Sequence, residues 1–158
     1  METTTDLLND FLARVIDEIG KDAASKKQKV PIASLRGEVT LDGETGAKAF
    51  LYAADYFKYL IYGRGPGKAP PVDNMRAWVE ANPDALARAK QVFKYITANQ
   101  LAFLIGRKIS QHGTDIYMGK KPGIDFLGIL EKNTPDLFKS IAMNEAIQIG
   151  TALKSAVR

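Results

Sequence analysis

The stretch that decides the fold class is ASLRGEVTLDGETGAKAFLYA, residues 33–53. Residues 33–41 alternate apolar and polar side chains, which predicts a half-buried strand. The apolar side chains on one face of this strand are Leu35, Val39 and Leu41. Residues 42–46 have turn chemistry, because glycine adopts positive φ at low cost. Residues 47–53 then predict a second strand, and the two strands an antiparallel hairpin.

Helical patterns lie on both sides of this hairpin. Residues 5–24 space their apolar side chains three and four apart, and Thr5 or Asp6 could cap the first turn by accepting a backbone N–H bond. Residues 54–62, ADYFKYLIY, suit a short helix ended by Gly63, although their aromatic density suits a strand equally well. We favour the helix.

Further helices are expected after the glycine- and proline-rich segment. Asp73 should cap a helix that carries Trp78, whose side chain we place in the core. A helix over residues 83–111 should begin with Pro83 at its first position and break near residues 97–98. The expected apolar stripe consists of Val92, Tyr95 or Ile96, Leu101, Leu104, Ile105 and Ile109.

The C-terminal third predicts two helices after a loop over residues 113–123. A short helix should contain residues 124–130, and Thr134-Pro135 should open a long last helix. Its apolar side is expected to consist of Leu137, Phe138, Ile141, Ala146, Ile149 and Leu153. The fold class is therefore α+β: an N-terminal helix, an antiparallel β-hairpin or small sheet, several helices and a long C-terminal helix. A chain of 158 residues fits one domain.

Composition excludes several classes of protein. Hydrophobic residues make up 46% and charged residues 25%, as in ordinary globular proteins. No apolar run approaches the ~20 residues that span a bilayer, and the polar N-terminal sequence METTTDLLND is unlike a signal peptide. There is no cysteine, which fits assembly in a reducing cytoplasm. The net charge of +4 is mildly basic.

Catalytic and metal-binding residues are scarce. The one histidine, His112, is expected at a helix end, where the helix dipole explains it. Zinc sites draw mainly on Cys and His, and no nucleophile-elbow motif is present. The candidate carboxylates, Asp17 with Glu18, Asp42 with Glu44, and Asp22, lie on predicted surfaces or turns. We therefore expect no enzyme, no catalytic residue, no metal and no cofactor.

The segment GRGPGKAPP, residues 63–71, is unlike a nucleotide-binding loop. The Walker pattern fails at Tyr62, where a glycine should stand, and at Ala69, where a hydroxyl should hold magnesium. Its prolines also remove N–H groups that could cradle a phosphate. Three glycines and three prolines instead predict a stiff loop that is ordered on a partner at low entropic cost.

Cations on two loops make the candidate partner interface. The second loop, residues 113–123, is also rich in glycine and lysine. The predicted interface residues are Arg64, Gly65, Pro66, Gly67, Lys68, Lys120 and Lys121. Arg and Lys can bind carboxylates or phosphates. The alternative is that residues 63–71 are only a connecting turn.

Two segments resemble a known family. The sequence YFKYLIYGRGPGKAPPVDNMRAW, residues 56–78, and AFLIGRKISQHGT, residues 102–114, are similar to stretches in the tail-completion or minor tail proteins of tailed bacteriophages, which are also called head–tail joining proteins. The resemblance spans residues 54–123. The chain departs from the family pattern over residues 82–98 and in its long C-terminal helix.

This resemblance implies a non-enzymatic virion subunit. Such a subunit forms a homo-oligomeric ring of 6 or 12 copies in the neck or upper tail, joins the portal to adjacent tail proteins, and is assembled in the bacterial cytoplasm without a membrane. Transient contact with DNA in the channel is part of this expectation. The basic loops should meet acids of a neighbour, such as those in residues 2–10, 17–22 and 42–44. The alternative is a phage nucleic-acid-binding accessory protein, which the basic isoelectric point favours.

Overall fold

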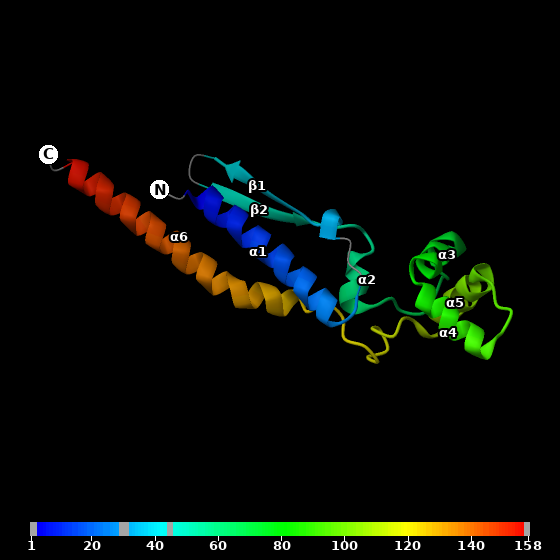
Figure 1. Ribbon diagram of the computed structural model, residues 1–158. Helices are drawn as coiled ribbons and strands as arrows, with labels where there is room; N and C mark the ends of the chain where they lie inside the picture. The colour runs from blue at the N-terminus through cyan, green and yellow to red at the C-terminus, as the bar shows by residue number, and fades with distance from the viewer. Residues whose placement is uncertain (1–2, 29–31, 44–45, 157–158) are drawn as a thin grey trace. The chain divides into compact units, whose positions relative to one another are not determined.

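The computed structural model describes residues 3–28, 32–43 and 46–156. The chain is α+β, as predicted: an N-terminal helix, a two-stranded hairpin, several helices and a long C-terminal helix (Figure 1). It divides into two compact units. Unit 1 comprises residues 1–61 and 124–158, and unit 2 comprises residues 62–123.

Helix α1, Thr4–Ser25, forms the centre of unit 1. The side chain of Thr3 accepts a bond from the backbone N–H of Asp6 at 3.2 Å, and the Asp6 carboxylate accepts from the Thr3 N–H at 2.8 Å. This capping box satisfies two N–H groups that the helix leaves free. The prediction of Thr5 or Asp6 as the cap was wrong, because Asp6 takes part from the third helical position. The buried residues of α1 are Leu8, Leu12, Val15, Ile19 and Ala23.

The hairpin packs on α1. Strands β1, Arg36–Asp42, and β2, Gly46–Tyr52, pair antiparallel. The first strand starts three residues later than expected, because a short 3-10 helix, η1, covers Ile32–Ser34. A Cβ on Gly37 would lie 2.9 Å from the Leu12 side chain, so only glycine permits this close packing. Leu41 is 75% exposed beside the turn, which contradicts its predicted place on a buried face.

Helix α6, Phe126–Ala156, is one continuous helix. The sequence predicted two helices, with Pro135 opening the second. Proline inside a helix removes one backbone bond, but neighbouring side chains bond to nearby carbonyls. Thr134 donates to the Leu130 carbonyl at 2.7 Å, and Asn133 donates to that of Ile129 at 2.8 Å. Neither bond reaches the Glu131 carbonyl, whose N–H partner the proline removes, and the helix nevertheless continues through Pro135.

The apolar residues of α6 lie on two sides of the helix. Ile129 is buried in the core that also contains Val15 and Ile19 of α1. Phe138, in contrast, is 65% exposed, as are most of the apolar residues after it. The prediction of one apolar side over residues 137–153 was therefore wrong.

Unit 2 contains three helices and the end of a fourth. Helix α2, Phe57–Tyr62, confirms the preference for helix over strand and leads into this unit. Helices α3, Val72–Ala81, α4, Pro83–Val92, and α5, Ala98–His112, follow. The predicted break is confirmed, and it begins at Phe93. Thr97 caps α5 by accepting from the Gln100 N–H at 3.2 Å.

Helix α3 differs from the prediction at both of its named residues. Its N-cap is Pro71, and Asp73 instead pairs with Arg76 at 3.3 Å. Trp78 is 48% exposed, because the buried position belongs to its neighbour Val79, which is 1% exposed. Successive helical residues point about 100° apart, so both cannot face α5.

Small and aliphatic residues make the core of unit 2. Ala102 of α5 is fully buried, and Gly106, one turn later, is buried near the Pro70 carbonyl. The side chains of Ile96 and Val79 are also buried. Of the alternatives Tyr95 and Ile96, the structure buries Ile96, whereas Val92 and Leu104 of the predicted stripe are exposed.

Candidate functional site

Glycines hold the loop of residues 63–71 against a second loop of unit 2. Gly63 has φ +74°, and a Cβ there would collide with the backbone nitrogen of Tyr117. A Cβ on Gly65 would lie 3.2 Å from the Tyr117 ring. Gly113, with φ +80°, lies under the same ring, and its Cβ would be 2.7 Å from the Arg64 carbonyl oxygen. These contacts and left-handed backbone angles require glycine.

Three hydrogen bonds of the loop backbone, two at Arg64 and one at Gly67, hold the loop in place. The Arg64 carbonyl accepts from the Thr114 N–H at 2.9 Å, and the Arg64 N–H donates to the Thr114 hydroxyl at 2.9 Å. Gly67 donates to the Ser110 carbonyl in the last turn of α5, also at 2.9 Å. The predicted stiffness of this segment thus has a structural basis in both loop and helix.

The seven predicted interface residues are unequal in their exposure and contacts. The Arg64 guanidinium donates to the Lys68 carbonyl at 2.9 Å, so this arginine also braces the loop. Pro66, Gly67 and Lys68 are exposed, as are Lys120 and Lys121. Lys121 lies 3.7 Å from the Asp115 carboxylate. The structure therefore places exposed lysines on both loops, and the loops meet at Tyr117.

The carboxylates considered for acid–base chemistry take part in structural bonds. Hydrogen bonds from Lys132 and then Asn133 lower the pKa of Glu18. Burial raises the pKa of Asp22, but hydrogen bonds from Lys26 and the Asp125 N–H outweigh it, and the net pKa is lowered. A general acid at neutral pH needs the opposite shift. Glu44 lies outside the described residues.

The described residues also show no catalytic or metal-binding arrangement around His112 or among the acidic side chains. His112 is the last residue of α5, as predicted, and its side chain is exposed. Over residues 3–28, 32–43 and 46–156, no three His, Cys, Asp or Glu side chains are grouped so that they could hold a metal ion. In the same ranges, no helix has the length and hydropathy to cross a membrane.

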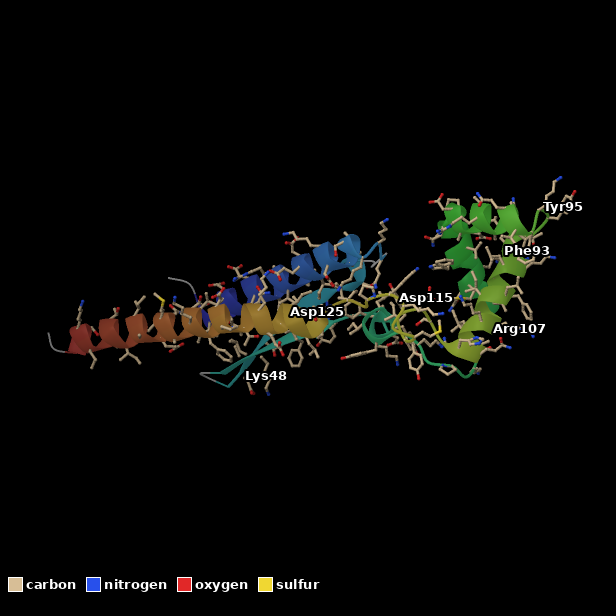
Figure 2. All side chains as sticks on the ribbon, turned by 90° about the horizontal axis from the view of Figure 1, so that it is seen from below. Lys48, Phe93, Tyr95, Arg107, Asp115 and Asp125 are labelled. Carbon is tan, nitrogen blue, oxygen red and sulfur yellow. The ribbon has the colours of Figure 1, made fainter. Side chains whose placement is uncertain are left out.

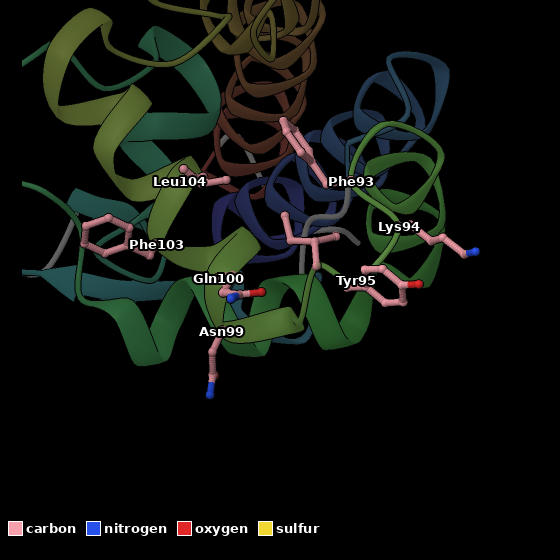
Figure 3. A pocket seen from close by; sticks show the side chains of 8 residues that line it. Phe93, Lys94, Tyr95, Asn99, Gln100, Phe103 and Leu104 are labelled. Carbon is pink, nitrogen blue, oxygen red and sulfur yellow. The ribbon is translucent and has the colours of Figure 1, made fainter.

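An aromatic groove that the sequence did not predict lies at the junction of α4 and α5. It has a volume of about 700 Å³, and its walls include Phe93, Tyr95, Phe103 and Leu104 (Figure 3). Tyr95 is 84% exposed and Phe103 58% exposed. The sequence interpretation assigned Tyr95 or Ile96 and Leu104 to the core stripe. The signal that could have found the groove is Phe93-Lys94-Tyr95, because a lysine between two aromatics rarely lies in a core.

A second exposed apolar surface lies on α6, which we call the outer α6 face and define as Leu127, Phe138, Ile149 and Leu153. These four side chains are between 57% and 65% exposed. Their spacing places them on the side of the helix opposite Ile129, Asn133 and Leu137. Thr4 at the start of α1 bonds to Glu145 at 3.3 Å, and α6 continues for eleven residues beyond that point (Figure 1).

Comparison of the chain with protein-family models, with curated proteins and with solved structures finds no match.

Proposed function

We propose that this protein is a structural virion subunit that forms a ring in the neck or upper tail of a tailed bacteriophage. The ring would join the portal to the tail through protein–protein contacts. The proposal draws on the sequence resemblance over residues 54–123, which no family model matches, and on one structural observation, the exposed apolar surface of unit 1. The second is the one that carries it.

The outer α6 face is the main part of that surface. A helix with apolar residues on both sides is typically buried on both sides. One side of α6 packs on α1, but no described residue covers the other. The stretch after Glu145, AIQIGTALKSA, contains a single charged residue. An unsupported helix of this length is marginal in water, so contact with another chain would stabilise it.

The exposed apolar side chains of α6 suit the centre of a subunit interface. Fully burying a Leu, Ile or Phe side chain contributes ~1.5–3 kcal/mol, and the outer α6 face offers four that are more than half exposed. A standard interface buries ~800 Å² per partner. The outer α6 face supplies the apolar centre of such an interface, and the alanines and polar residues around it supply the rim.

The hairpin offers a second contact surface in unit 1. Its outward face carries Phe50 and Tyr52, whose rings stack at 6.2 Å, with the Arg36 guanidinium 5.0 Å from the Tyr52 ring. Both outer edges of this two-stranded sheet are unpaired within the described chain. Aromatic and arginine side chains are enriched at protein interfaces, so this face suits a neighbouring copy.

The lysines of the two loops would contact a different neighbour. Lys68 and Lys120 are exposed, and no ion pair within the described ranges involves either side chain. A stiff loop loses little entropy when it binds. Carboxylates on an adjacent layer of the particle are therefore suitable partners for these two lysines.

The test uses the phage that encodes the chain. Without the protein, particles should accumulate as DNA-filled heads and separate tails, and wild-type protein should restore joining. The double variant Lys68→Glu/Lys120→Glu should fold normally and fail to restore joining, while Lys27→Glu/Lys58→Glu, two exposed lysines of unit 1, should restore it. Joined, infectious particles made in the absence of the protein would refute the proposal.

A further inference from the structure

Positive charge is concentrated in unit 2. This unit has ten Lys and Arg against four Asp and Glu, a formal charge of +6, whereas unit 1 has twelve against fourteen, a formal charge of −2. The contrast is strongest between Asp84 and Asp115. The thirty residues between them contain five Lys or Arg and no acid. Such a segment attracts a polyanion.

The exposed side of α5 arranges part of this charge beside aromatic and apolar side chains. The residues on this exposed side are spaced three and four apart along the helix. They are Gln100, Phe103, Leu104, Arg107, Lys108 and Gln111. The opposite side of α5 contains the buried Ala102 and Gly106. The outward side therefore changes along the helix from an aromatic half to a cationic half. Figure 2 labels Phe93 and Tyr95 at one end of this surface and Arg107 further along α5.

Further cations lie at both ends of this helical surface. Lys94 lines the aromatic groove, and its ammonium lies 5.6 Å from the Tyr95 ring. At the other end, the bond from Gly67 to the Ser110 carbonyl brings the neighbouring residue Lys68 to the last turn of α5. Within the described ranges, no ion pair involves Lys94, Arg107 or Lys108.

We propose that this side of unit 2 binds single-stranded nucleic acid. In this arrangement the bases stack on Phe103 and Tyr95, and the phosphates contact Lys94, Arg107 and Lys108. The proposal goes beyond a role in joining head to tail.

The combination of side chains favours a single strand over other polyanions. Exposed rings offer stacking platforms that a base can reach only when it is free of a duplex. Every base has a π-face, so the surface needs no particular sequence. Asn99 and Gln100 in the groove wall add amide groups that can bond to base edges. An acidic peptide would use the cations but would leave the rings without planar partners.

The experiment measures binding of the full-length protein to a labelled oligothymidine of 20 nucleotides by fluorescence anisotropy, between 50 and 200 mM salt. A duplex of the same length and an acidic peptide are the competing probes. The expected result is tightest binding to the single strand, with affinity falling as salt rises. Tyr95→Ala/Phe103→Ala should weaken single-strand binding at least about tenfold and change duplex binding little.

A second pair of variants tests the cations. Arg107→Glu/Lys108→Glu should weaken binding of both nucleic acids and lower the salt slope for the single strand by about 1.4, at ~0.7 per phosphate contact. The matched controls in unit 1 are Lys27→Glu/Lys58→Glu for charge and Phe50→Ala for an exposed ring. Both controls should bind as the wild type does.

Three outcomes would overturn this inference. They are no binding of the single strand at 50 mM salt, tighter binding of the duplex or the peptide, and equal losses in the control variants. A separate mass measurement gives the assembly state of the protein and does not depend on the nucleic-acid binding assay. A ring that binds no nucleic acid would therefore refute this inference alone.

Discussion

Gly63 is the loop residue at which an added Cβ would disturb the candidate interface most, because the Tyr117 backbone lies against it. Gly63→Ala would add a Cβ against the Tyr117 backbone at a positive φ. We expect it to destabilise unit 2 by about 1–3 kcal/mol. The readout is the fluorescence of Trp78, the only tryptophan, during denaturant unfolding. The matched control is Gly150→Ala in α6, where nothing lies within 4 Å of the new Cβ. It should stabilise the protein by ~0.5–1 kcal/mol, and equal destabilisation by both variants would contradict the role given to Gly63.

The residues that sequence alone misplaced share one cause. Trp78, Leu41 and Leu104 are large and apolar, so they were assigned to buried positions. Their exposure depends on which neighbouring element covers them, and the period of one helix or strand does not specify that. Val79 rather than Trp78 faces the core because α5 packs on that side of α3. The loop itself was predictable because clustered glycine and proline forbid regular structure, but its packing against Tyr117 was not.

The contact between α1 and the start of α6 predicts a pH dependence at the scale of elements. The Asp22 carboxylate accepts from Lys26 at 2.8 Å and from the Asp125 N–H at 2.9 Å. Its pKa is lower in the folded state than in the unfolded state. Ionised Asp22 therefore stabilises the fold above its unfolded pKa near 3.8, and this contribution is lost as pH falls through the lower folded value.

Asp22→Asn should reduce stability at pH 7 and flatten its decline below about pH 4. The measurement is denaturant unfolding from pH 2.5 to pH 7, followed by far-UV circular dichroism. Asp10→Asn, an exposed acid on the same helix, is the control and should keep the wild-type profile. The same decline in Asp22→Asn as in wild type would contradict the assignment.

The outer α6 face predicts a loss of self-association without a loss of fold. Ile149→Asp places a carboxylate on this face, where burial in an interface would be costly. We expect smaller assemblies by sedimentation velocity and, at a dilution where the wild type is also dissociated, an unchanged unfolding midpoint, because Ile149 is already 60% exposed. Gln148→Asp puts the same charge on another side of the helix and is the matched control. Identical sedimentation of Ile149→Asp and wild type would exclude this face as an interface.

Element types were predictable from the sequence, but their ends and continuity were less so. The hairpin, α1 and α5 follow from alternation, helical spacing and caps that lie within a few residues. Helix α6 runs without a break from Phe126 to Ala156, with Pro135 inside it. Thr134-Pro135 has the sequence of a helix start, so only the structure distinguishes the two readings.

At the scale of the whole molecule, the chain separates two kinds of surface. Unit 1 carries the outer α6 face and the hairpin, which are apolar or aromatic. Unit 2 carries the stiff loop and a formal charge of +6, against −2 for unit 1. A subunit with two different contact surfaces associates head to tail, and such contacts close into rings when the rotation between copies permits.

The sequence predicted one part of the candidate site, the loop of residues 63–71, and missed another, the aromatic groove. The loop of residues 63–71 and its two cations, Arg64 and Lys68, were evident from composition. The aromatic groove was not, because Phe93 and Phe103 are ten residues apart and line one groove only when α4 and α5 fold together. Arg64 was predicted as a contact residue, and its bond to the Lys68 carbonyl gives it a supporting role within the loop.

The most direct test of the central claim is the mass of the purified protein, measured by native mass spectrometry across a range of concentrations. The proposed ring predicts a discrete species at 6 or 12 times the 17.3 kDa chain, which grows with concentration. A single species at the mass of one chain at every concentration, with and without the portal protein, would contradict it.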